Sequence, residues 1–351
     1  MERKKKMVGD RIRLGRMANA LSLQELSEIL AYSGHKLTRA AISNYEMGRA
    51  FPSEQILKAM SKELGLSESF FYKQEREGFG IRRFRAADLV MKHEMELRAY
   101  LQVMLEQFLE VDGLLEIRSA GAPPERVTVK IGEEEKVEEL VDRLRREWGN
   151  AEQPIASVCG MLEDNGWYVF EMPDVFEEDQ VSGVEESSGN LFIAYTIEDT
   201  VDETRYRILE EVGHAYLEGE NPEHQKWLCK AFARAMLIPR AQVFREFGRE
   251  RTSISFFELS LAKQKYGMSK VNIRKRLNAL GLLPQEAVGN YGDRMNKLNY
   301  RKKIDSKQDV LYFMEYPTKF RMKVLAARKE GLISPEEAAC LLPRQYTQIL
   351  L

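Results

Sequence analysis

The chain has 351 residues, of which 44% are hydrophobic and 31% charged, and its formal net charge at pH 7 is −2. This length is sufficient for two or three domains that each bury a hydrophobic core. No stretch approaches the roughly 20 apolar residues of a membrane-spanning helix, and the basic N-terminus leads into a helical pattern rather than an apolar signal segment. The three cysteines, Cys159, Cys229 and Cys340, are far apart, which argues against a disulfide framework or a CxxC metal site. We therefore expect a cytoplasmic protein with no membrane partner.

Residues 21–66 have the pattern of successive short helices. Ser22 can cap a first helix, which Gly34 ends, and Thr38 stands where the N-cap of a second helix belongs. Gly48 suits a left-handed cap after that helix, and residues 51–53, Phe-Pro-Ser, start a third, amphipathic helix. Two helices joined by a turn are typical of a probe for the DNA major groove.

The second of these helices has one apolar and one polar face. Ala41, Ile42 and Tyr45 recur at helical spacing, so the polar side chains lie on the opposite face. Arginine can bond guanine through two donors, asparagine can bond adenine, and serine or threonine can contact a base edge or a phosphate oxygen. The candidate DNA-binding residues are Gln24, Thr38, Arg39, Ala40, Ser43, Asn44 and Arg49. An ordinary helical bundle with a solvated polar face is the alternative interpretation.

The order of residues in this segment resembles the lambda-repressor-like (XRE) helix-turn-helix family. The resemblance covers about residues 8–71 and depends on Ala-Ile-Ser at 41–43, Tyr-Glu at 45–46, Gly48 and Pro52. One departure is a longer turn, residues 31–37. The resemblance implies binding to double-stranded operator DNA, usually by a homodimer, and a location at the nucleoid.

The charge distribution favours the same interpretation. Residues 1–74 contain 13 Lys and Arg against 8 Asp and Glu, although the whole chain is slightly acidic. A basic unit favours an acidic partner, and DNA phosphate fits that description. Residues 3–6, Arg-Lys-Lys-Lys, could form an arm that touches phosphate or could be solvated.

Beyond residue 74 the pattern predicts a mixture of helices and strands. A charged, Gly-containing linker at 75–84 precedes a long helix at 89–117, and further helices are expected at 137–148 and 155–165. Strands are expected at 167–171, at 181–184 as an edge strand, and at 191–195.

The helix expected at 205–218 carries the sequence EEVGH and is followed by KAFARAMLIP at 230–239. Together these resemble the ImmA/IrrE family of zincin-like metallopeptidase domains. In that family an HExxH helix supplies two histidine ligands to Zn²⁺ and a glutamate that activates the metal-bound water. The resemblance implies Glu211 as the catalytic base and His214 as a ligand, with Glu210 in place of the first histidine. At the position of the usual acidic third ligand this chain has Leu228, which cannot bind metal.

Other ligand sets are also incomplete. Glu210, His214 and Glu218 would form one stripe of a helix, but its ends lie roughly 12 Å apart at 1.5 Å rise per residue. His224, in a loop expected at 219–224, would have to fold back. A carboxylate-rich site for Mn²⁺ or Fe²⁺ and a solvated Glu/His face are both compatible with the pattern. We expect no cofactor, with zinc as the alternative, and a peptidase-like domain that has lost its chemistry.

Charge alternates along the rest of the chain. Residues 133–223 contain 26 Asp and Glu against 6 Lys and Arg, whereas residues 263–303 contain 11 Lys and Arg against 2 Asp and Glu. Ser269 can cap a helix whose Lys270, Arg274, Lys275 and Arg276 point outward, either as solvated scaffold or as a second DNA contact. Residues 323–342 predict a small helical hairpin that docks on the core or builds a dimer contact.

The sequence therefore predicts an α+β protein, mostly α, in four parts. These are a helix-turn-helix domain at 1–74, a linker and long helix at 75–120, a degenerate zincin-like domain at 121–250 and a helical region at 251–351. The expected function is a DNA-binding transcriptional regulator, a repressor, whose peptidase-like half responds to a protein or small-molecule effector. An active metallopeptidase that cleaves a repressor, or the antitoxin of a toxin–antitoxin pair, are the alternatives.

Overall fold

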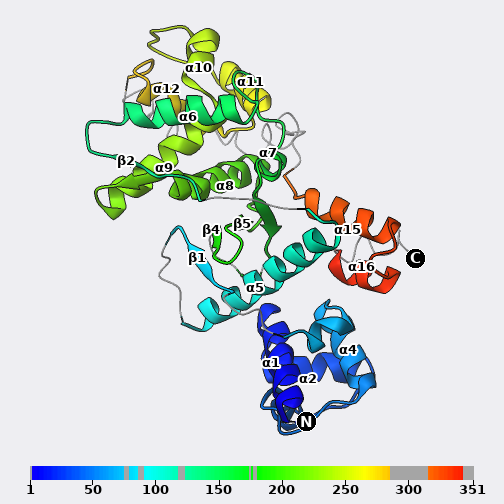
Figure 1. Cartoon of the computed structure of the whole chain (residues 1–351). Coiled ribbons are helices and arrows are strands. Elements are labelled where there is room, and N and C mark those ends of the chain that lie inside the picture. The colour runs from blue at the N-terminus through cyan, green and yellow to red at the C-terminus, as the bar shows by residue number, and fades with distance from the viewer. Residues whose placement is uncertain are drawn as a thin grey trace.

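The computed structural model describes residues 2–74, 79–85, 91–117, 123–173, 175–176, 180–284 and 315–342. These residues form a mixed α+β structure that is mostly helical (Figure 1), which confirms the expected class. Within the described ranges, no helix is both long and apolar enough to span a membrane.

The N-terminal unit consists of four α-helices and a short 3-10 helix. Ser22 and Thr38 are the N-caps of α2 and α3, as expected, and Ser53 is the N-cap of α4. Each accepts a hydrogen bond from the backbone N–H three residues on. Ser22 and Glu25 form a complete capping box, and Gly65 ends the fourth helix in the left-handed conformation. The elements are α1 (Glu2–Ala18), α2 (Leu23–Tyr32), α3 (Arg39–Glu46), α4 (Glu54–Leu64) and η1 (Glu68–Tyr72).

The long helix α5 (Met91–Leu114) lies between the N-terminal unit and the rest of the molecule (Figure 1). It packs along α1, where Arg11 pairs with Glu106 at 2.7 Å, and against the C-terminal helix α15 (Lys319–Lys329), where Lys323 pairs with Asp112. Helix α16 (Pro335–Leu341) folds back beside α15, as the predicted hairpin requires. The Phe108 ring of α5 stacks on the Phe320 ring of α15 at a centroid distance of 4.2 Å.

The central sheet has four strands in the order β1-β4-β5-β3. Strands β3 (Tyr168–Glu171) and β5 (Leu191–Tyr195) are parallel, and β4 (Val181–Glu185) is antiparallel to both β5 and β1 (Ile81–Arg83). Strand β4 is therefore an interior strand, and the expectation of an edge strand there was wrong. Beyond β4 the edge strand is β1, which lies in the segment expected to be a linker, and β3 is the opposite edge. A short pair, β2 (Val127–Val129) and β6 (Leu217–Gly219), lies outside this sheet.

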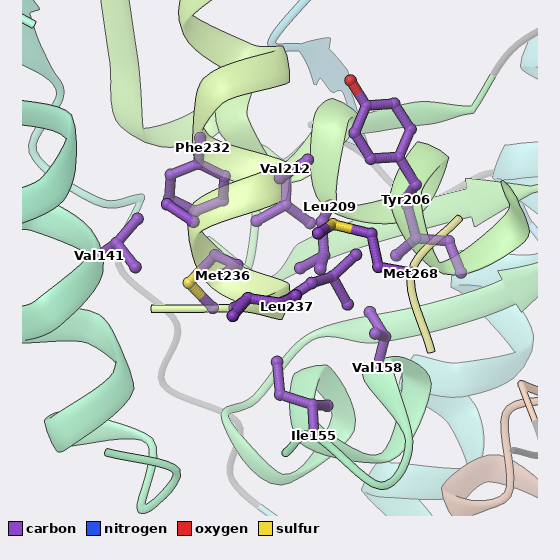
Figure 2. Close-up of a cluster of buried hydrophobic side chains, with 14 of the residues drawn as sticks. Val141, Ile155, Val158, Tyr206, Leu209, Val212, Phe232, Met236, Leu237 and Met268 are labelled. Atoms are coloured by element: carbon purple, nitrogen blue, oxygen red, sulfur yellow. The ribbon is translucent and has the colours of Figure 1, made fainter. Parts of the chain in front are cut away.

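Side chains of the sheet enter two different cores. Alternate residues of a strand point to opposite faces, so Tyr168 and Phe170 join the core of the N-terminal helices, α5 and the hairpin, whereas Val169 joins the other core. That second core is built by α6 (Glu135–Glu147), α7 (Val158–Asp164), α8 (Val201–Tyr216), α9 (Pro222–Leu237), α10 (Arg240–Phe247), α11 (Phe256–Tyr266) and α12 (Lys270–Ala279). Figure 2 shows Leu209 and Val212 of α8 beside Phe232 and Met236 of α9.

This second core continues across the domain boundary expected between residues 250 and 251. Leu259 of α11 and Ile273 of α12 are fully buried in it. On α12, Ser269 is the predicted cap, but Arg274 and Arg276 are buried rather than outward. Arg276 donates to Glu138 and to the Ile238 carbonyl. Of the four predicted cations, Lys275 is exposed and Lys270 is partly exposed, with its ammonium 3.8 Å from the centroid of the Phe256 ring.

A buried ion pair joins the C-terminal segment to the second core. The Glu315 carboxylate pairs with Arg205 of α8, and both side chains are almost fully buried. The same carboxylate accepts hydrogen bonds from the Val158 and Cys159 N–H groups at the N-terminus of α7, at 2.9–3.0 Å. These N–H groups lack intrahelical partners, and the positive end of the helix dipole favours a carboxylate there. The hairpin is thus linked to α7 and α8 as well as to α5.

Candidate functional site

The polar face of α3 is exposed as the sequence predicts. Thr38, Arg39 and Ala40 are exposed at its N-terminus, and Ser43 and Asn44 are partly exposed farther along. Ile42 is fully buried and anchors the opposite face in the core. The Thr38 hydroxyl accepts from the Ala41 N–H at 3.2 Å, so it also caps the helix.

The two outlying candidates are also at the surface. Gln24 is exposed on α2, which packs against α3, and its amide donates to Glu28 at 2.7 Å. Arg49 is exposed just beyond the C-terminus of α3. The seven candidate residues thus come from α2, α3 and the turn after α3, and the described structure leaves a surface on each.

A partly buried ion pair fixes α3 to α1. The Arg16 guanidinium contacts both carboxylate oxygens of Glu46, at 2.6 and 2.9 Å, and also donates to the Leu21 carbonyl at 2.6 Å. This two-donor geometry restricts rotation of α3 more than a single contact would. Gly9 brings α1 close to the same end of α3, because a Cβ there would lie 2.3 Å from the Tyr45 carbonyl oxygen. Sequence reasoning missed both contacts, since partners 30 or more residues apart leave no local pattern.

The basic residues near the N-terminus are part of α1. The helix begins at Glu2, so residues 3–6 do not form a separate arm in the described structure. Lys4 lies over the rings of Tyr72 and Phe51, at 5.6 and 6.0 Å from their centroids, and Lys6 pairs with Asp10.

On α8, the Glu211 side chain is turned toward the sheet. Its Oε1 accepts hydrogen bonds from the backbone N–H and the hydroxyl of Ser182 on β4, at 3.1 and 3.0 Å. Its Oε2 lies 3.7 Å from Arg85, and the side chain is almost completely buried. A carboxylate occupied in this way holds α8 against β4. Neither Ser182 nor Arg85 was predicted as a partner of Glu211, because the contacts of both residues with α8 depend on how the strands of the sheet pair.

His214 is also buried, at 9% exposure. Burial, together with the positive charges of Arg85 and Arg126, lowers the pKa of its imidazole to about 4. The ring is therefore neutral at pH 7, and its Nδ1 lies 3.4 Å from the Gln225 amide nitrogen on α9. The same amide donates to the Leu217 carbonyl at 3.1 Å, so Gln225 ties the end of α8 to α9.

The other positions of the expected ligand sets have different surroundings. Glu210 pairs with Arg207 at 3.7 Å, and Leu228 is fully buried in the core. Helix α8 ends at Tyr216, which places Glu218 on β6, and His224 lies in the first turn of α9, so the stripe and the loop expected there were wrong. Across the described ranges, no group of three or more His, Cys, Asp or Glu side chains is placed to hold a metal ion. These residues therefore do not fit a catalytic zinc, which needs three protein ligands.

Helices α8 and α9 pack closely against each other. A Cβ on Gly213 would lie 3.1 Å from the Cα of Cys229, and Cys229 is fully buried. Burial raises the pKa of the Cys229 thiol to about 12, so the thiol is protonated and packs as a small apolar side chain.

Comparison with protein-family models, with curated proteins and with solved structures found no match to this chain.

Proposed function

We propose that this protein is a sequence-specific, DNA-binding transcriptional regulator, a repressor, in which α2 and α3 act as a helix-turn-helix. The observation that carries the proposal is the placement of α3. Its N-terminal turn exposes Thr38, Arg39 and Ala40, while buried Ile42 and the Arg16–Glu46 ion pair fix the helix to the body of the unit. A rigid helix with an exposed polar edge is what reading of base edges requires.

The proposed roles follow from side-chain chemistry. Arg39 would bond a guanine in the major groove, and Asn44 an adenine or a phosphate oxygen. Arg49 and Gln24, at the margins of the surface, would contact phosphates and fix the register on the duplex. A single unit of this kind reads few bases, so we further propose a homodimer that binds two half-sites about one helical turn apart.

The second half of the chain is proposed to be a regulatory domain without peptidase activity, located with the DNA at the nucleoid. Two observations support this proposal. The Glu211 carboxylate accepts two hydrogen bonds from Ser182, and within the described ranges no set of three ligands surrounds His214. Because those residues do not fit zinc, the metallopeptidase alternative has less support than the regulator.

The test begins with a selection of DNA fragments from the genome that encodes this protein, followed by affinity measurements on the selected site and on random duplex. Arg39→Ala should weaken binding to the selected site by about 1–3 kcal/mol and change binding to random DNA little, because a base contact is lost. The matched control is Arg245→Ala, which removes the same charge from an exposed arginine on α10. Equal losses on both DNAs would assign Arg39 to phosphate contact, and failure to select any sequence would refute the proposed function.

A further inference from the structure

A groove of about 1530 Å³ lies between α1 and the N-terminal half of α5. Its walls come from these two helices and from the end of η1 with the two residues after it (Figure 1). The volume exceeds the roughly 300–1,000 Å³ of most small-molecule pockets, so the groove suits a longer ligand such as a segment of polypeptide. None of the seven candidate DNA-binding residues lines it.

Basic side chains predominate among the charged residues of the groove. Its lining contains one acidic residue, Asp10, and seven basic residues: Arg3, Lys4, Lys6, Arg11, Arg13, Lys73 and Arg98. Four of the seven have a carboxylate partner within the chain, in the pairs Lys6–Asp10, Arg11–Glu106, Lys73–Glu110 and Arg98–Glu94. The other three, Arg3, Lys4 and Arg13, are exposed and have no carboxylate partner among the described residues. The groove therefore keeps three cations that an acidic partner can neutralise.

The groove also has an apolar part. Met7, Leu14 and Met17 are partly buried on α1, and Met95 is 47% exposed on α5. Met7 and Leu14 are seven residues apart, so they lie on one side of α1, about 10 Å apart at 1.5 Å rise per residue. Methionine side chains adapt their shape and are common on surfaces that bind helices of varied sequence. An amphipathic helix with apolar side chains at intervals of three, four and seven residues would cover this part of the groove.

We propose that the groove is the docking site for a helix of a partner protein, apolar on one face and acidic along the edges of that face. The apolar face would pack on Met7, Leu14 and Met95, and carboxylates at its edges would pair with the unpartnered arginines. Arg3 and Arg13 are ten residues apart on α1, about 15 Å along the helix axis, so the partner needs acidic residues about three turns apart. Exposed ion pairs add little affinity each, but they select the partner and its direction.

A polypeptide fits this groove better than a nucleic acid backbone does. Phosphate groups would neutralise the unpartnered cations but would leave the methionine side chains without an apolar contact. The carboxylates of Asp10, in the groove, and of Glu94, beside Arg98, would also repel a strand that carries a charge at every phosphate. The inference goes beyond the proposed function and does not depend on it.

The experiment uses the full-length protein with ¹³C-labelled methionine methyl groups. The probe is a synthetic helical peptide of about four turns, with leucine at positions i, i+4, i+7 and i+11 and glutamate on both sides of that stripe. Met7 and Met95 report on the groove, whereas Met236 and Met268, fully buried in the second core, serve as internal controls. We expect saturable shifts at Met7 and Met95 alone, with a dissociation constant below about 100 µM.

Two control peptides separate the contribution of charge from that of the apolar face. The same peptide with glutamine in place of every glutamate should bind at least about tenfold more weakly, because it cannot pair with the cations. A peptide of the same composition with its leucines spread around the helix should give no saturable shift at Met7 or Met95. Equal binding of either control peptide would overturn the proposal, as would the absence of shifts with the probe.

Substitutions of arginine test the cations of the groove. Arg3→Gln with Arg13→Gln removes two exposed charges and should weaken binding of the probe about fivefold to tenfold. The matched control, Arg146→Gln with Arg245→Gln, removes two exposed arginines outside the groove and should leave binding unchanged. Equal weakening by both double variants would indicate attraction by net charge alone, and the proposed site would be wrong.

Substitutions of methionine test the apolar part. Met95→Glu places a negative charge there, at a side chain exposed enough to accept it, and should abolish the shift of Met7. Met322→Glu makes the same change at a 64% exposed methionine on α15 and should leave that shift intact. A Met7 shift that survives Met95→Glu, or that Met322→Glu also removes, would contradict docking in the groove.

A random-sequence DNA duplex is titrated in the same way. If it shifts Met7 and Met95 with the affinity of the peptide, and the Arg3/Arg13 double variant removes those shifts, the groove binds phosphate and the proposed partner is overturned. These measurements need no operator. Failure to select a DNA sequence would therefore refute the proposed function alone, and failure of the peptide to bind would refute the docking site alone.

Discussion

Removal of the Glu315 carboxylate is expected to loosen the junction between the hairpin and the second core. The Arg205 side chain has no measurable exposure, and burial lowers its pKa although Glu315 partly offsets this effect. Glu315→Ala would leave a buried guanidinium without its counter-charge and would strand two backbone N–H groups at the start of α7.

The magnitude follows from the burial of both partners. Breaking a buried ion pair by removing one partner typically costs about 3–5 kcal/mol. Arg205 keeps hydrogen bonds to the carbonyl oxygens of Ile155, Ala156 and Gly267, at 2.6–3.3 Å, so the lower end applies. We expect Glu315→Ala to lower the free energy of unfolding by about 3 kcal/mol.

Urea unfolding followed by tryptophan fluorescence measures this cost, because Trp167 is buried in the second core and Trp148 packs against it. Glu152→Ala is the control, since it breaks an exposed ion pair with Arg245 and should cost about 0.5 kcal/mol or less. A double variant, Arg205→Met with Glu315→Gln, removes both charges and should be at least about 1 kcal/mol more stable than Glu315→Ala. The reasoning is refuted if Glu315→Ala costs no more than Glu152→Ala, or if the double variant is the least stable.

Three further substitutions test the site and the sheet. Glu211→Gln should leave DNA affinity unchanged, because the Oε1 of glutamine can still accept hydrogen bonds from Ser182. Wild type and variant should also show the same metal-dependent cleavage of a co-expressed repressor, namely none. Because burial lowers the pKa of His214 in the folded state, its contribution to stability is fully present above the unfolded pKa of about 6.5. Up to about 3 kcal/mol of that contribution is lost as the pH falls to about 4. His214→Gln should therefore make the free energy of unfolding, measured with urea, depend less on pH over that range. Gly183→Ala should lower stability by about 1–3 kcal/mol, since its Cβ would lie 2.3 Å from the Arg82 carbonyl oxygen.

Each of these has its own control. Metal-dependent cleavage that Glu211→Gln removes would contradict the proposal that this domain has no peptidase activity. His35→Gln, at a partly exposed histidine of the N-terminal unit, should leave the pH profile unchanged, and a matching flattening would disprove the assignment to His214. Gly113→Ala, on α5 where the added Cβ meets no atom within 4 Å, should be neutral or slightly stabilising, so a loss equal to that at Gly183 would rule out steric contact as the cause.

Local sequence patterns predicted those features whose causes are local. The caps at Ser22, Thr38 and Ser269 hydrogen-bond groups three residues away, so short motifs reveal them. The buried strand at 191–195 and the buried face of α3 at Ile42 were likewise visible as runs or periodic apolar residues.

Features that depend on distant partners were not predictable. Arg276 was expected at the surface because it is charged, but its partner Glu138 lies on α6, 138 residues earlier in the chain. Strand β4 looked like an edge because β1 has only three residues, two of them arginines, and lacks an apolar alternation. The contact between Glu211 and Ser182 became visible only when the sheet placed β4 beside α8.

The shared core of α5, the N-terminal helices and the hairpin has a consequence for synthesis on the ribosome. Phe108 on α5 is covered by Phe320, which is added more than 200 residues later in translation. At a translation rate of about 5–20 residues per second, at least about 10 s pass between the synthesis of Phe108 and that of Phe320. In a chain that terminates before residue 319, this apolar face of α5 would stay exposed next to the N-terminal unit. Chaperones and proteases recognise such exposed apolar surface. The core that α5 shares with the N-terminal helices is therefore complete only after α15 has been synthesised.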